Sequence, residues 1–371
     1  MDDQKKSVLF ITDSKFIEYT IAGGVQICTS EFIEYIEKAG FSICTFKVNT
    51  SAKLTHRIKA KLGVESYEIY NVDPYLEGIV NVINTRKIQF VLLNQLNLSY
   101  WVVKIKNRVN ANVKFIGLSH GNESGDFLHE ITKTSKTSFL QTWRLGRLLV
   151  KEKELFSEIL DGVITISDNE TSIDQWLGAQ NILFLPRILK PGFINWNPVA
   201  KTIGFVGTLD HLPNLSGIEL LSNQLQLNGF DGQFRLVGAP SQLGYQLEKR
   251  YTFIKYCGVL SNQQLMEEMG NWSIFLNPVF WHARGSSTKL SQGINWGIPV
   301  ITTPAGVRGY DLINKDMITA DNLPATFAGM VLKAIGSDLF LKELKQASVD
   351  NAINFNSESW AGKLSIYLNK L

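Results

Sequence analysis

The residue types best suited to chemistry gather in residues 284–303. This stretch begins Arg-Gly-Ser-Ser-Thr-Lys, continues with a helical pattern, and ends with the break Gly297-Ile298-Pro299 and an apolar strand at 300–303. A helix N-terminus presents unpaired N–H groups and a positive dipole end, which suit a phosphate or diphosphate. Lys289 adds a charge with three donors, and three residues add hydroxyls: Ser286, Ser287 and Thr288. The stretch therefore predicts a site for a phosphorylated small molecule at the edge of an α/β sheet.

The same stretch has a simpler interpretation, which is a capped surface helix with a solvated lysine. The glycine-proline break and the buried strand after it favour the binding site over this alternative. Arg284 and Gly285 precede the hydroxyl residues, and Arg284 is a second candidate cation for the ligand. It could instead pair with an acidic residue of another domain.

Other candidate residues follow predicted strands, because ligands of parallel α/β sheets bind beyond the carboxyl ends of the strands. His120 follows an apolar run and could bond a sugar hydroxyl, act as a polar catalytic group, or cap a loop. Gly207-Thr208 could touch the phosphates or the sugar, and Gly258-Val259 could meet the edge of a nucleobase. Gly23-Gly24 could admit a phosphate before the first helix or form a plain turn.

Metal and cofactor signals are weak. The acidic and histidine residues after His120 have no regular ligand spacing, so we expect no metal there: Glu123, Asp126, His129 and Glu130. The glycine pattern is not Gly-x-Gly-x-x-Gly, which disfavours a nicotinamide cofactor.

Strand signals alternate with helical signals along the whole chain. The short apolar run at 8–12 is typical of a strand buried on both faces. Further strand candidates lie at 41–48, 90–93, 114–118, 162–166, 202–207, 234–238, 253–256, 274–276 and 300–303. This alternation predicts parallel sheets with right-handed crossovers. Prolines 186, 191 and 198 mark a linker. We expect two Rossmann-like, doubly wound α/β domains, 1–195 and 196–350, facing across a cleft, with a C-terminal helix at 351–371 packing back toward the first domain.

The composition excludes several classes of protein. The 371 residues are 44% hydrophobic and 19% charged, which is typical of a globular protein of two domains. A net charge of +3 is too small to indicate nucleic-acid binding. Three scattered cysteines give no disulfide framework, and no apolar run of about 18 residues or targeting signal is present, so we expect a cytoplasmic protein.

Two basic stretches have amphipathic patterns. Lys53, Arg57 and Lys61 are spaced four apart, and a second set shares a helical pattern with Trp143 and Leu148: Arg144, Arg147, Lys151 and Lys153. Both stretches could contact anionic lipid head groups or an anionic acceptor, which would make the protein peripheral to a membrane. The alternative is a solvated helix face.

Residues 285–303 resemble the donor-site signature of glycosyltransferases with the GT-B fold, of the family-four type. That signature is roughly Gly-x-x-x-Lys-Leu-x-Glu-Ala-x-x-x-Gly-x-Pro-Val-Val-x-Thr, and this chain matches it at Gly285, Lys289, Leu290, Gly297, Pro299, Val300 and Thr302. Weaker landmarks follow in the same order along nearly the whole chain: Gly23-Gly24, His120-Gly121, 161–167, Gly207 with Pro213-Asn214, and Gly258-Val259.

The resemblance implies a hexosyl-type transferase that moves a sugar from a UDP- or GDP-linked donor with retention of configuration. The acceptor would be a glycan, glycolipid or protein, as in the synthesis of surface polysaccharides at the inner face of the plasma membrane. No metal is implied, because cationic side chains and a helix N-terminus take its role. Lys289 and the hydroxyl residues would hold the diphosphate, His120 would contact the sugar, and Val259 would meet the base through its backbone.

The chain departs from the family pattern at several positions. Gln292 stands where the family has a glutamate that binds the ribose, and an earlier glutamate falls at Arg284. Thr208 and Pro213 replace the usual arginine and lysine, and Arg308 could restore the missing charge. Two alternatives therefore stay open, a non-catalytic nucleotide-sugar-binding partner of an active transferase and a nucleotide-sugar 2-epimerase. The epimerase requires an acid/base pair of carboxylates, and the sequence offers no persuasive one.

Overall fold

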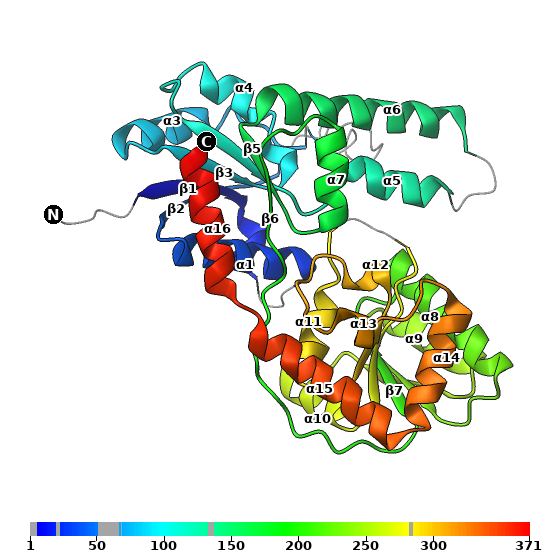
Figure 1. Ribbon diagram of the computed structural model, residues 1–371. Coiled ribbons are helices and arrows are strands. Elements are labelled where there is room, and N and C mark those ends of the chain that lie inside the picture. The colour runs from blue at the N-terminus through cyan, green and yellow to red at the C-terminus, as the bar shows by residue number, and fades with distance from the viewer. Residues whose placement is uncertain (1–5, 20–22, 51–66, 68, 133–136, 282–284) are drawn as a thin grey trace. The chain divides into compact units, whose positions relative to one another are not determined.

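The computed structural model describes residues 6–19, 23–50, 67, 69–132, 137–281 and 285–371. The chain divides into two compact units (Figure 1). The first unit is Met1–Arg187 with Asn356–Leu371, and the second is Ile188–Phe355. Each unit contains one sheet, and every strand pair in both sheets is parallel.

The sheet of the first unit has six strands in the order β2-β1-β3-β4-β5-β6. Its strands are β1 (Ser7–Asp13), β2 (Ser42–Val48), β3 (Phe90–Asn94), β4 (Lys114–Leu118), β5 (Gly162–Thr165) and β6 (Ile182–Phe184). The chain order reverses between β1 and β3, and such a switch point is where ligands of doubly wound sheets bind. β6 is absent from the predicted strands, because it is only three residues long and half-buried.

Helices flank this sheet: α1 (Gly24–Lys38), α3 (Leu76–Thr85), α4 (Trp101–Lys106), α5 (Glu123–Thr132), α6 (Phe139–Glu154), α7 (Asp168–Trp176) and α16 (Ser357–Lys370). α16 packs against α1 within this unit, as Figure 1 shows. The end of the chain forms two helices rather than the one expected. The side chain of Asn356 accepts a hydrogen bond from the Ser359 N–H (2.9 Å), and this cap starts α16 after a break.

A buried ion pair fixes α1 to the end of the first unit. Arg187, with a side chain only 1% exposed, contacts Glu31 of α1 through two of its nitrogens, at 2.9 and 3.0 Å. Removing one member of a buried pair leaves an uncompensated charge.

We expect Glu31→Ala to lower the free energy of unfolding by about 3 kcal/mol, measured by urea denaturation. Glu34→Ala on the same helix is the matched control, because Glu34 faces Lys38 at a partly exposed position (3.5 Å). That control is expected to change stability by less than about 1 kcal/mol. Equal effects of the two variants would contradict the assignment of the Arg187 pair as a buried anchor.

The sheet of the second unit has five strands in the order β11-β10-β7-β8-β9. They are β7 (Thr202–Val206), β8 (Gln233–Val237), β9 (Ile254–Gly258), β10 (Ile274–Asn277) and β11 (Val300–Thr302). Gly204 of β7 lies under Trp272, where a Cβ would come within 2.1 Å of the indole ring. The order reverses between β7 and β10, so this sheet has its own switch point.

The helices of the second unit are α8 (Leu212–Leu227), α9 (Ser241–Arg250), α10 (Asn262–Gly270), α11 (Thr288–Asn295), α12 (Pro304–Val307), α13 (Lys315–Ile318), α14 (Pro324–Ile335) and α15 (Asp338–Asn354). No single helix within the described residues is long and apolar enough to cross a membrane. The bent pair of α14 and α15, at 109°, would pass by length and composition alone.

Candidate functional site

A glycine lies at the carboxyl end of each of three neighbouring strands in the second unit. Gly207 follows β7, Gly238 follows β8, and Gly258 ends β9. The Gly207 N–H donates to Val237 O (3.0 Å), and the Gly238 N–H donates to Gly258 O (2.9 Å). A Cβ on Gly238 would lie 1.9 Å from Gly207 O, and its φ of +142° also favours glycine. This edge of the sheet is therefore built from closely packed main chain.

Lys289, in the first turn of α11, lies across Gly207. A Cβ on Gly207 would come within 2.8 Å of Lys289 Cε. The Lys289 ammonium donates to Asn214 Oδ1 (2.7 Å) and lies 5.4 Å from the centre of the Phe205 ring. The predicted cation therefore sits at the end of β7, beside the switch point of this sheet.

The surroundings of the Lys289 side chain disfavour its charged form. Burial lowers the pKa of Lys289 to about 7, and the guanidinium of Arg308 acts in the same direction. Its only hydrogen-bond partner among the described residues is the neutral amide of Asn214. Because part of the side chain still reaches solvent, an anion could approach the ammonium and restore its usual preference for the charged form.

The loop before α11 is anchored by Asn277, the last residue of β10. Asn277 is fully buried; its Nδ2 donates to Thr302 Oγ1 (3.0 Å), and its Oδ1 accepts from Ser287 Oγ (3.0 Å). Ser287 is the N-cap residue of α11, but its hydroxyl donates to Asn277 instead of capping the helix. This bond holds the loop to the end of β10.

Two further residues hold the loop from behind. Arg308 is buried, and its Nε donates to Gly285 O (2.7 Å). Tyr310 donates its hydroxyl hydrogen to Ser287 O (2.5 Å) and accepts from the Ser291 N–H (3.0 Å). Arg308, which the sequence suggested as a replacement for the missing cation, therefore lies beside the loop before α11 and stabilises it through Gly285 O.

Several hydrogen-bond donors at Ser286 and at the start of α11 have no acceptor among the described residues. The Ser286 hydroxyl is buried and has no hydrogen-bond partner among the residues that the structure describes. The backbone N–H groups of Thr288 and Lys289 also have no acceptor there. A buried polar group usually finds a partner, so these donors are candidates to bind an oxyanion; together with the Lys289 ammonium they are called the Lys289 cradle below.

The remaining predicted donor residues are spread along the same edge. Thr208 is exposed, and its carbonyl accepts from Asn214 Nδ2 (2.7 Å). Val259 is 64% exposed after the edge strand β9, two strands away from β7. Gln292 lies one turn beyond Thr288 on α11 and is half-buried. Arg284 lies outside the described residues.

In the first unit, His120 lies just past β4, next to the switch point. It shares a hydrogen bond of 2.7 Å between its Nε2 and Asn94 Oδ1, at the end of β3. Asn94 Nδ2 donates to Thr12 Oγ1 (2.8 Å) and Thr29 Oγ1 (3.0 Å), so its Oδ1 faces the ring and Nε2 carries the hydrogen. The edge of Phe32 packs on the imidazole, with centroids 5.5 Å apart. His120 therefore has a fixed orientation.

The loop after His120 is tied to buried carboxyl groups. The Asn122 N–H donates to Glu170 Oε1 (3.3 Å), and its Nδ2 donates to Asp174 Oδ1 (3.3 Å). Glu152 accepts from the Ser124 N–H (2.9 Å). Burial raises the pKa of both Glu152 and Asp174, so these two carboxyl groups hold a proton more tightly than exposed carboxyl groups do. The network braces the loop that carries His120.

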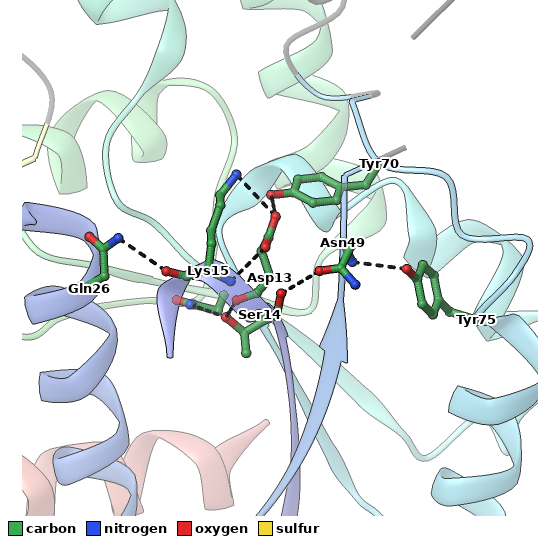
Figure 2. Close-up of polar contacts among 9 residues, drawn as sticks. Asp13, Ser14, Lys15, Gln26, Asn49, Tyr70 and Tyr75 are labelled. Atoms are coloured by element: carbon green, nitrogen blue, oxygen red, sulfur yellow. Dashed lines mark hydrogen bonds and ion pairs between the residues drawn. The ribbon is translucent and has the colours of Figure 1, made fainter. Parts of the chain in front are cut away.

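A second polar network lies at the ends of β1 and β2 (Figure 2). Asp13 is buried and accepts from the Lys15 N–H (3.0 Å) and from the Tyr70 hydroxyl (2.8 Å). Lys15 Nζ lies 3.2 Å from the same carboxylate. Gln26 of α1 donates to Lys15 O (3.3 Å), and Gly24 is exposed at the start of that helix. These contacts tie Asp13 and Lys15, directly after β1, to Tyr70 and to Gln26 of α1.

Three asparagines were missed by the sequence reasoning: Asn94, Asn214 and Asn277. Each sits at a strand end or in a first helical turn and orients a predicted site residue. Asn214 had a signal, because it follows Pro213 in a pattern that resembles the family. Within the described residues, no three or more His, Cys, Asp and Glu side chains are grouped so that they could hold a metal ion.

Comparisons with known proteins find a family-level similarity for part of the chain. Residues 200–337 match the family model described as glycosyl transferases group 1. No curated protein sequence matches the chain significantly. The matched range contains β7 to β11, the glycine edge and the Lys289 cradle.

Several solved structures share the fold of the chain. Sucrose-phosphate synthase from Thermosynechococcus elongatus is 14% identical, with a TM-score of 0.68 over 98% of both chains. Anabaena HepE, solved with UDP and glucose, is 12% identical, with a TM-score of 0.64 over 99% of this chain and 100% of that one. The pneumococcal O-GlcNAc transferase GtfA, solved with UDP and GlcNAc, is 9% identical, with a TM-score of 0.60 over 99% of both. The chain therefore has the GT-B fold of these structures, and residues 200–337, within its second unit, are similar to the glycosyl transferases group 1.

Proposed function

We propose that the protein transfers a hexosyl group from a UDP- or GDP-linked donor to a hydroxyl of a glycan, glycolipid or protein. Retention of configuration and independence from metal ions belong to the proposal. The observation that carries it is the start of α11, where four consecutive residues bring together the Lys289 ammonium, the Ser286 hydroxyl and the Thr288 and Lys289 N–H groups. Apart from the bond of Lys289 to Asn214, none of these donors has a hydrogen-bond partner among the described residues. Such a set of donors matches the negative charge of a diphosphate.

The cradle would act on the leaving group. In the transfer, the bond between the anomeric carbon and the diphosphate oxygen breaks, and the oxygen leaves with the electron pair. A bond forms between the anomeric carbon and the acceptor oxygen, whose proton passes to the departing diphosphate or to water. Preorganised donors stabilise the charge that develops on the diphosphate, and they do so most strongly in a site that excludes water. Lys289 and the start of α11 would thereby supply the charge that a divalent cation supplies in other enzymes.

The other site residues receive roles by resemblance to the family. We assign contact with the transferred sugar to His120, whose orientation is fixed by Asn94. Gln292, half-buried on α11, would bond the ribose hydroxyls through its neutral amide. The main chain at Gly258 and Val259, exposed after β9, would meet the base.

A second candidate function is a non-catalytic partner that binds a nucleotide sugar. It is motivated by Arg284 and Gln292, which stand where the family has glutamates. Incubation of the purified protein with UDP- and GDP-hexoses in EDTA distinguishes the two. Release of the nucleoside diphosphate, by slow hydrolysis or by transfer to an added acceptor, is the result expected of the enzyme. Donor binding without any turnover would favour the partner.

We also propose that the enzyme works at the cytoplasmic face of a membrane, through α6. The first five residues of this helix include three exposed apolar side chains, Phe139 (82%), Leu140 (72%) and Trp143 (45%). Arg147 stacks on the Trp143 ring at 4.9 Å, and Lys153 is exposed further along the helix. Exposed aromatic and aliphatic side chains beside basic ones suit an anionic bilayer surface. The other basic stretch, with Lys53, Arg57 and Lys61, lies outside the described residues.

Flotation with vesicles tests this contact. We expect the protein to float with anionic vesicles at low salt, and to lose most of this binding at high salt or with neutral vesicles. Trp143→Ser should reduce flotation several-fold, because the indole buries apolar surface in the interface. Trp176→Ser is the matched control, since Trp176 is 75% exposed on α7 of the same unit. Absence of flotation at low salt, or equal losses in both variants, would overturn the proposal.

A further inference from the structure

Asn214, in the first turn of α8, is the hydrogen-bond partner of Lys289, the candidate cation of the second unit. It is 4% exposed, and both ends of its amide are engaged. Its Nδ2 donates to Thr208 O (2.7 Å), and its Oδ1 accepts from Lys289 Nζ (2.7 Å). Because a carbonyl can only accept, the first bond fixes which end of the amide faces the lysine.

The surroundings of Lys289 contain no negative charge among the described residues. From β7 it meets the Phe205 ring, from α8 the Asn214 amide, and beyond α12 the Arg308 guanidinium. Asp210 and His211, on the turn before α8, have no hydrogen bond or ion pair with Lys289. An anion bound at this position would therefore supply a counter-charge that none of the described residues supplies.

We propose that Asn214 is a positioning residue that holds Lys289 beside Gly207 with a neutral partner, so that the donor diphosphate binds together with a proton. This inference rests on the proposed function, because the diphosphate is the anion that the cradle would take. A carboxylate at position 214 would pair with the lysine permanently and would repel the diphosphate. An amide orients the lysine but carries no charge, so it does not compete with the diphosphate for the ammonium.

The coupling has a defined direction with pH. Since burial lowers the pKa of Lys289 to about 7, much of the free protein carries a neutral amine above that pH. The bound diphosphate favours the ammonium and so raises this pKa. Binding above pH 7 therefore takes up a proton, and affinity falls by up to about tenfold for each pH unit above 7.

Calorimetric titration with UDP, or with GDP if that is the base bound, tests the proposal in EDTA from pH 6.5 to 9. Titrations at pH 8 in buffers of different ionisation enthalpy count the protons taken up. For the unaltered protein we expect uptake approaching one proton and the decline in affinity with pH. For Asn214→Asp we expect uptake near zero, a flat pH profile, and affinity at pH 7 lower by about tenfold or more.

Two other variants make the test selective. Asn223→Asp makes the same change on the same helix, where Asn223 accepts from the Tyr251 hydroxyl (2.8 Å), and it should keep the normal profile. Asn214→Ala removes the partner without adding a charge, so it should shift the midpoint of the pH dependence downward and weaken binding several-fold. This variant carries the test if Asn214→Asp does not fold.

The failures are distinguishable. Normal binding with a normal pH profile in both Asn214 variants would overturn the inference and leave the donor site standing. Absence of UDP and GDP binding to the unaltered protein would overturn the donor site, and this inference with it.

Discussion

Lys289→Met is expected to reduce sugar transfer by about 100-fold or more, because loss of one preorganised donor to a developing charge typically costs about 3 kcal/mol. Lys289 is the one cation whose ammonium lies over the glycine edge of β7 in the described part of the chain. Affinity for the nucleoside diphosphate should fall in the same variant, because the cradle loses its charge. Initial rates of donor turnover and calorimetric binding measure the two effects.

Stability separates this loss from misfolding. The folded-state pKa of Lys289, about 7, lies below its ordinary value of 10.5, so between these values the unfolded chain holds a proton that the folded chain lacks. Lys289 therefore opposes folding in that range, and Lys289→Met should be at least as stable at pH 8. Lys333→Met is the matched control, since Lys333 also lies over a ring, that of Phe340 (5.0 Å). Full activity of Lys289→Met would contradict the assigned role.

His120→Ala is expected to lower transfer by about 100-fold while leaving nucleotide binding within about twofold. The reason is position, because Asn94 and Phe32 hold the imidazole at the carboxyl edge of the first sheet. The phosphate cradle belongs to the second unit and is untouched by this change. Transfer rates and calorimetric affinity, measured on the same preparation, give the two quantities.

A second histidine supplies the control for that result. His129 lies on α5 of the same unit, where its Nδ1 is 3.2 Å from Gly125 O, and His129→Ala should keep normal transfer. Equal losses in the two variants would indicate damage to the unit rather than to the site. Normal activity in His120→Ala would remove His120 from the mechanism.

The strands were predictable because a parallel sheet covered on both faces requires nearly continuous apolar runs. β1, β3 and β10 are such runs, and their residues are almost entirely buried. β6 escaped prediction because three half-buried residues carry no periodic signal. The break before α16 depends on the single side-chain cap of Asn356, which a helical pattern does not reveal.

The candidate site was predictable where neighbours in sequence are neighbours in space. Ser286 and Ser287 directly precede Thr288 and Lys289 in the first turn of α11, so the sequence alone predicted an anion site there. Asn277 instead reaches Thr302, 25 residues away, because β10 lies beside β11 in the sheet. Asn214 reaches Lys289 across 75 residues for the same kind of reason. Strand order decides such contacts, and a single sequence carries no direct signal of it.

The central claim is that the second unit binds a nucleoside diphosphate through the Lys289 cradle without a metal ion. The most direct test is calorimetric titration of the unaltered protein and of Lys289→Met with UDP and GDP in the presence of EDTA. The claim predicts that one of the two nucleotides binds the unaltered protein in EDTA, and that this binding is lost in Lys289→Met. Binding that requires a divalent cation, or that survives unchanged in Lys289→Met, would contradict it.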